Sequence, residues 1–160
     1  MKLASFLIPV ALLAQTRDAE FNRLAGHFFH EAVFRYDPVQ ATQAGFHQYD
    51  SLLPSFSSEE IQAQITALRR YEGLFQNFGS RGLSPSVAAD RDLALSQIRG
   101  NLLELESIRP WEKNPDTYSS GVTNAIFVIM SRAFAPPEAR LKSAIARERL
   151  IPRVFQSARH

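Results

Sequence analysis

The chain has 160 residues, of which 18 are Lys or Arg and 16 are Asp or Glu, so its formal net charge is +2. This length suits one domain with a sizeable core, and the near balance of charge argues against a nucleic-acid-binding protein. Cysteine is absent, which excludes disulfides and thiolate metal sites and is compatible with either an oxidising or a reducing compartment.

The first fifteen residues have the features of a short secretory signal peptide. Lys2 precedes an apolar run over residues 3–13 and the small residue Ala14, so cleavage is expected near Ala14 or the residue after it. The run is too short for a stable membrane span. We therefore expect an exported protein, periplasmic or extracellular, with a signal peptide at 1–15 and an incomplete N-terminal helical domain at 16–160. An N-terminal core helix is the alternative.

Residues 18–36 predict an amphipathic helix with an aromatic-rich buried stripe, because apolar residues recur at helical spacing. This stripe consists of Phe21, Leu24, Ala25, Phe28, Phe29, Ala32, Val33 and Tyr36. His27, His30 and Glu31 lie beside it with a spacing that could present three metal ligands. Their order matches neither of the zinc motifs carried by a single helix, which favours polar residues flanking a structural helix.

The next stretch, residues 36–50, combines a helix stop, a helix start and a polar aromatic cluster. Asp37 before Pro38 predicts an N-cap followed by proline at the first helical position, and a short helix to Ala44. Gly45 then stands where a residue with positive φ is needed. An irregular loop should follow, a common place for functional residues. It should expose Phe46, His47, Tyr49 and Asp50.

Two long amphipathic helices are predicted next. Ser57 and Glu60 form a capping box that starts the first, which runs to about residue 78 and is ended by glycines. The second should span 85–108, because Pro110 disfavours helical geometry in the residue before it. Their expected buried residues are Ile61, Ile65, Leu68, Tyr71, Phe75, Phe78, Leu95, Ile98, Leu102, Leu105 and Ile108.

The last third of the chain predicts an irregular aromatic patch at 111–118 and two more helices. The first of these, about 116–134, is apolar on every face over residues 125–130, which favours a helix enclosed by others; a buried strand is the alternative. The final helix begins near Glu138 and is kinked or restarted at Pro152. Its inward residues should be Leu141, Ala144, Ile145, Val154, Phe155 and Ala158. No stop signal follows them, so the chain is expected to finish within an element.

These patterns predict an all-α fold. No turn pair lies between alternating apolar runs, and no glycine-rich phosphate loop or fixed-period repeat is present. We expect a helical bundle of about five to six helices.

Three segments occur in an order typical of one family. They are DPVQATQAGFHQYD at 37–50, RPWEKNPDTY at 109–118 and RLIPRVFQSAR at 149–159. The chain resembles the N-terminal portion of the bacterial family catalogued as domain of unknown function 885. That resemblance implies the N-terminal part of a larger, mostly helical and often exported peptidase-like fold, similar to zinc metallopeptidases with a His-Glu-x-x-His helix.

The resemblance also limits what this chain does. It contains no His-Glu-x-x-His, and its histidines are His27, His30, His47 and His160. We therefore carry over no catalytic or metal-binding residue, and expect no cofactor in this chain, with zinc in a full-length relative. The implied role is one helical wall of a substrate cleft, inactive alone, with the missing C-terminal remainder as partner and a peptide as substrate.

Four side chains are candidates for substrate-groove contacts, because tyrosine and histidine can donate to a carbonyl or carboxylate oxygen. They are His47, Tyr49, Asp50 and Tyr118. Each also has a structural interpretation: Asp50 caps a turn, the tyrosines fill gaps between helices, and His47 is exposed.

The basic C-terminal end supports an alternative function. From Glu138 onward there are six Lys or Arg against two Glu. A free-standing exported module could bind an acidic partner with this face. The competing interpretation is that the arginines pair with acidic residues of the remainder. The six are Arg140, Lys142, Arg147, Arg149, Arg153 and Arg159.

Overall fold

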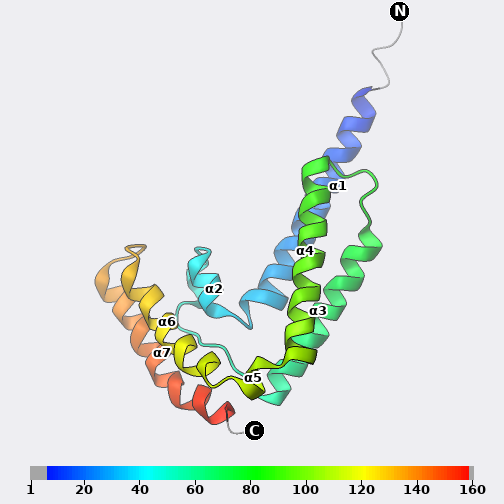
Figure 1. Cartoon of the computed structure of the whole chain (residues 1–160). Coiled ribbons are helices and arrows are strands. Elements are labelled where there is room, and N and C mark those ends of the chain that lie inside the picture. Colours follow the sequence, from blue (N-terminus) through cyan, green and yellow to red (C-terminus); the bar gives the residue numbers. More distant parts are fainter. Residues whose placement is uncertain (1–6, 159–160) are drawn as a thin grey trace, which may run out of the picture.

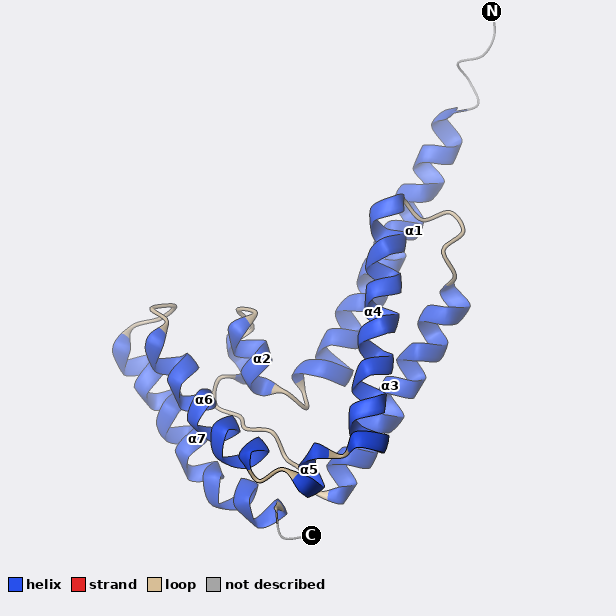
Figure 2. Ribbon diagram, viewed as in Figure 1, coloured by secondary structure: helices blue, strands red, loops and turns tan. Residues whose placement is uncertain are grey.

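A computed structural model describes the backbone of residues 7–158 and the side chains of residues 16–158. All regular structure in this range is helical, as predicted (Figure 2). The predicted signal peptide lies partly outside the described residues, which begin with the backbone of the first helix. The helices are α1 (Leu7–Phe28), α2 (Pro38–Gln43), α3 (Ser58–Phe78), α4 (Pro85–Leu103), α5 (Pro110–Lys113), α6 (Asp116–Ser131) and α7 (Pro137–Ser157).

The helices form two arms that meet at an angle (Figure 1). One arm contains α1, α3 and α4, and the other contains the antiparallel pair α6 and α7. The short helix α2 lies between the arms and packs against α6, while α5 lies at the base where the arms meet. None of the helices described is both long and apolar enough to span a bilayer.

Aromatic rings form the core of the first arm. The Phe28 ring lies 5.5 Å from that of Tyr71 and 5.4 Å from that of Phe75, and Phe21 lies 5.3 Å from Phe75. These edge-on and tilted contacts are the geometry that aromatic pairs prefer. All four side chains are at most 1% exposed, so the stripes predicted for α1 and α3 are confirmed at these positions.

A π-helical turn, η1 (Phe29–Phe34), changes which residues of the first stripe are buried. Phe29 was expected in the core but is 36% exposed, whereas Phe34 is 4% exposed. The extra residue in a π turn rotates every later side chain around the helix axis relative to an α-helix. The helical spacing therefore gave the wrong aromatic residue here.

A second π turn, η3 (Glu104–Ile108), ends the helix predicted for 85–108. The chain leaves it at Arg109 with φ of 55°, a left-handed conformation directly before Pro110. Ile108 lies in this last turn and is 55% exposed, so its predicted burial is wrong. The residues after Pro110 form the short helix α5 instead of an irregular loop.

The second arm is less enclosed than predicted. Helix α6 buries Ala125 and Ile129 but leaves Phe127 65% exposed, so the expectation of a fully enclosed helix is wrong. Helix α7 runs through Pro152 without a break. Because α7 packs mainly on α6, and α6 mainly on α7 and α2, each keeps a free side. Residues expected inside but exposed are Met130, Leu141, Ile145, Phe155 and Ala158.

The hydroxyl of Tyr71 donates a hydrogen bond of 2.7 Å to Glu31 Oε2. Burial and this bond raise the pKa of Tyr71 to about 12, above the ordinary value near 10. A raised pKa means that Tyr71 stabilises the fold below pH of about 10 and that this contribution is lost as pH rises towards about 12. We expect the stability of the wild type relative to Tyr71→Phe to fall across this range, measured by urea unfolding; a constant difference would contradict the assignment.

Candidate functional site

The centre of the molecule is built on residues 37–50, where the predicted start of the short helix and the positive φ after it are confirmed, but Asp50, which was expected to be exposed, is buried at 5% exposure. Asp37 Oδ1 accepts a hydrogen bond of 2.9 Å from the backbone amide of Gln40 and so caps α2, which starts with Pro38. Gly45 has φ of +89°, which glycine adopts without strain. A short 3-10 helix, η2 (His47–Tyr49), replaces the predicted irregular loop and delivers Asp50 back to the side of α2.

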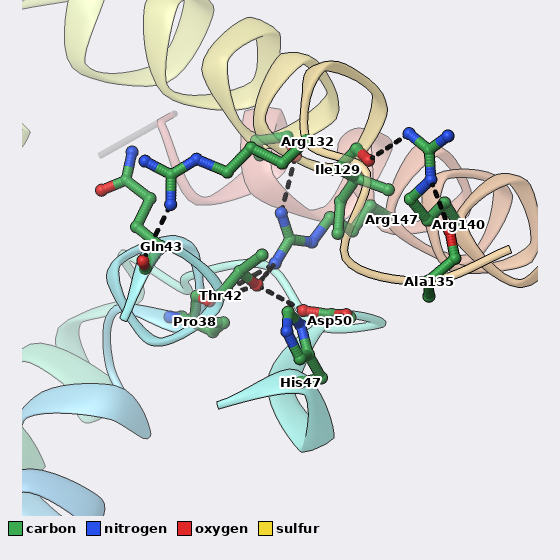
Figure 3. A network of polar contacts seen from close by, with 11 residues as sticks. Pro38, Thr42, Gln43, His47, Asp50, Ile129, Arg132, Ala135, Arg140 and Arg147 are labelled. Carbon is green, nitrogen blue, oxygen red and sulfur yellow. Dashed lines mark hydrogen bonds and ion pairs between the residues drawn. The ribbon is translucent and has the colours of Figure 1, made fainter. Parts of the chain in front are cut away.

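A buried polar network joins this segment to α7 (Figure 3). Thr42 Oγ1 lies 2.7 Å from Asp50 Oδ1 and 3.1 Å from the Pro38 carbonyl, and it accepts a 2.7 Å hydrogen bond from Arg147. The single hydroxyl proton goes to the nearer, charged Asp50 oxygen, because charge-assisted bonds are stronger. The Thr42 hydroxyl therefore links the Asp50 carboxylate to the Arg147 guanidinium through one hydrogen bond to each.

Arg147 is fully buried, at 0% exposure, and contacts both α2 and α6. Its guanidinium donates 2.6 Å to the Ala125 carbonyl of α6 and 3.3 Å to the Pro38 carbonyl of α2. Burial lowers the pKa of Arg147, and the negative charges of Asp50 and Asp37 oppose that shift. One cation thus ties α2, α6 and α7 together.

Arg147 was missed as a central residue because it was grouped with the surface arginines. Its place in the sequence did carry a signal: it continues the spacing of Ala144, Ile151 and Val154, which is the buried side of α7. An arginine in the middle of an apolar stripe indicates either a buried ion or a break in the stripe.

His47 lies at the exposed edge of the network. Its Nδ1 is 3.1 Å from Asp50 Oδ2, and its ring stacks on that of Phe134 with centroids 4.0 Å apart. Asp50 therefore orients an imidazole whose side chain is 41% exposed. The pair could hold or move a proton. Two side chains are too few ligands for a protein metal site.

The four candidate residues are not brought together as one groove. Tyr49 turns towards η1, where its hydroxyl lies 3.0 Å from His30 Nδ1. Tyr118 is buried and donates 2.6 Å to the Trp111 carbonyl, so it fills a gap between α5 and α6. His47 and Asp50 belong to the polar network. Their contact with a substrate stays a prediction.

The side chains of His27, His30 and Glu31 serve different partners. His30 contacts Tyr49, while Glu31 is held by Tyr71 and Arg70 and lies 3.6 Å from His27. Within the described range, no group of three His, Asp or Glu side chains is placed to hold a metal ion. The residues described thus do not fit the zinc site of a metallopeptidase, which needs three protein ligands.

Two of the basic residues of the C-terminal end act inside the fold. Besides Arg147, Arg140 caps the last turn of α6 by donating 2.7 Å to the Met130 carbonyl, and it also donates to the Ala135 carbonyl. The basic binding face considered for the C-terminal end therefore lacks Arg140 and Arg147. Arg159 lies outside the described residues.

A groove lies between the two arms and has a volume of about 490 Å³. It is lined by residues of η1, α2, α3, α4, η3, α5 and α6 and by the loop before α3. None of the four candidate residues lines it. Half of its polar side chains are uncharged carboxamides, namely Gln40, Gln43, Gln64, Gln97, Asn101 and Asn124.

Comparison with known proteins gave one relationship. Residues 38–160 match the family described as "Bacterial protein of unknown function (DUF885)". No match was found among curated proteins or among solved structures. The matched region begins with the first residue of α2 and includes the polar network and nearly all of the groove. Because it covers well over half of the sequence, the chain belongs to the DUF885 family of bacterial proteins.

Proposed function

We propose that this chain forms one helical wall of the substrate cleft in an exported, zinc-dependent peptidase-like hydrolase. The metal ligands and the catalytic base would come from another part of the complete enzyme. Export is inferred from the signal-like residues 1–15, and the peptidase likeness from the sequence segments that resemble the family's metallopeptidase-like members.

The groove between the arms is the observation that carries this proposal. Its volume of about 490 Å³ is in the range of small-molecule and peptide sites, and several helices converge on it. The buried Arg147 network fixes α2 against α6 and α7, so the α2 wall of the groove is held in place by charge-assisted bonds. A rigid wall is what positions a substrate for a reaction.

A hydrolase of this kind needs a zinc-bound water in addition to a wall. Zinc supplies an activated water and polarises the scissile carbonyl. The described residues of this chain offer only pairs such as His47 with Asp50, so we derive no catalytic step from them. Their role in the proposal is to bind and orient the substrate.

The test uses a longer family member that contains this chain together with a His-Glu-x-x-His helix. We expect it to cleave short peptides, to lose that activity on treatment with a chelator and to regain it with zinc. The 160-residue chain should cleave nothing and bind no zinc stoichiometrically. Tight zinc binding by this chain alone, or peptide cleavage that a chelator leaves intact, would contradict the proposal.

A further inference from the structure

Six carboxamide side chains line the groove between the arms. Gln40 and Gln43 come from α2, Gln64 from α3, Gln97 and Asn101 from α4, and Asn124 from α6. We propose that these side chains bind an extended, uncharged stretch of polypeptide through hydrogen bonds to its main chain. The inference rests on the proposed function only in the choice of a peptide as ligand, because it concerns recognition and not hydrolysis.

The carboxamides are available for a ligand. Among the described residues, none of the six side chains forms a hydrogen bond, although Gln64, Gln97 and Asn101 are only half-exposed. The two on α2 are three residues apart and the two on α4 are four apart, so each pair shares one helix face. Four helices therefore present free amides to a single space.

A carboxamide matches the peptide group chemically. It has two N–H donors and an oxygen acceptor in one plane, while each peptide unit offers one donor and one acceptor. A Gln or Asn side chain can therefore donate to a main-chain carbonyl and accept from a neighbouring main-chain amide at the same time. Such bonds do not depend on the ligand's side chains, which predicts broad sequence tolerance.

The charges around the groove disfavour ionic ligands. No Lys or Arg lines it, although the chain has 18 of them, and its only acidic residues are Asp37 and Glu104. Asp37 is already committed to the N-cap of α2. A phosphate-bearing ligand would find no cation here, which excludes nucleotides as a good fit.

The aromatic side chains favour a peptide over an oligosaccharide. Sugars stack on exposed ring faces, but Trp111 is only 7% exposed and its indole N–H donates to the Leu105 carbonyl. Phe56 packs edge-on against Tyr118, with centroids 5.0 Å apart. These rings belong to the fold and leave the hydrogen-bonding groups as the main means of recognition.

The groove borders a second depression at α6, which suits an extended ligand. Asn124 lines both the groove and a shallow, open depression beside it. Ser120, Thr123 and Phe127 also line that depression, and Phe127 is 65% exposed. A peptide that reaches from the groove into this depression would place an apolar side chain against Phe127.

The test measures binding of a peptide of alanine, serine and leucine, acetylated and amidated at its ends, to the 160-residue chain by calorimetry. We expect the double variant Gln64→Leu with Asn101→Leu to bind about tenfold or more weakly, as two lost hydrogen bonds imply. The matched control is Gln62→Leu. It changes an exposed glutamine that lies on α3, as Gln64 does, but outside the groove, so binding should be unchanged.

A second probe tests the main-chain contacts directly. An analogue with two peptide N–H groups replaced by ester oxygens should bind the wild type several-fold more weakly than the parent peptide, and the difference should shrink in the double variant. Equal binding of both probes to all variants, or binding of a chitin-type tetrasaccharide in place of the peptide, would overturn the inference.

The two proposals fail in different ways. If a longer family member cleaves peptides with zinc while the double variant of this chain binds the peptide as tightly as the wild type, the carboxamide inference is wrong and the proposed function stands. If this chain binds the peptide through the carboxamides but no longer family member hydrolyses it, the proposed function is wrong instead.

Discussion

Replacing Arg147 by alanine is expected to lower the free energy of unfolding by about 3–5 kcal/mol, the usual cost of removing one member of a buried charged network. The guanidinium is fully buried and donates to Ala125, Pro38 and Thr42. Its loss leaves the nearly buried Asp50, 5% exposed, without the cation to which Thr42 links it. A chain of this size has a total stability of only about 5–15 kcal/mol, so the variant should be close to unfolding.

Urea unfolding of matched variants measures this effect. Arg149→Ala removes an exposed arginine from the same helix and should change stability by less than about 0.5 kcal/mol. Arg147→Lys keeps the charge but not the planar fork that reaches three acceptors, so an intermediate loss is expected. If Arg147→Ala proved as stable as Arg149→Ala, the network would not hold the second arm in place.

Truncating Phe28 should have a similarly large effect through packing instead of charge. Phe28 is 0% exposed and touches the rings of Tyr71 and Phe75, so Phe28→Ala opens a cavity at the contact between α1 and α3. Substitutions of this kind cost about 3–5 kcal/mol, including the cavity term. Thermal or urea unfolding gives the measurement.

The control for Phe28 is the same substitution at an exposed phenylalanine. Phe127→Ala removes an equal side chain that is 65% exposed, and it should change stability by no more than about 0.5 kcal/mol. A large loss at Phe127 would show that the outer side of α6 is covered in solution. A small loss at Phe28 would show that α1 does not form part of the core.

The local features of the fold could be predicted from the sequence because their causes lie within a few residues. Asp37 with Pro38 sets the start of α2, and Ser57 sets that of α3, where its hydroxyl accepts from the Glu60 amide. The helical spacing of Ile61, Leu68 and Phe75 correctly gave the buried side of α3. Both π turns escaped prediction, since a one-residue insertion in a helix has no local composition signal.

The candidate site was predicted less well, because it depends on contacts between distant segments. The segment 37–50 was expected to expose functional residues on a loop, but its polar side chains mostly contact one another and Arg147. The groove is lined by carboxamides from four helices, and single glutamines scattered over 85 residues give no pattern along the chain.

The sequence by itself determined the all-α class, the caps and breaks of the helices, and membership of a bacterial family. Tertiary structure alone decided that Arg147 is buried, that α6 and α7 each keep an exposed apolar side, and that six amides face one groove. The physical reason is how far apart in the sequence the interacting residues lie. Caps and helical periodicity act within one or two turns, whereas burial depends on which elements meet, and Arg147 meets Thr42 across 105 residues of chain.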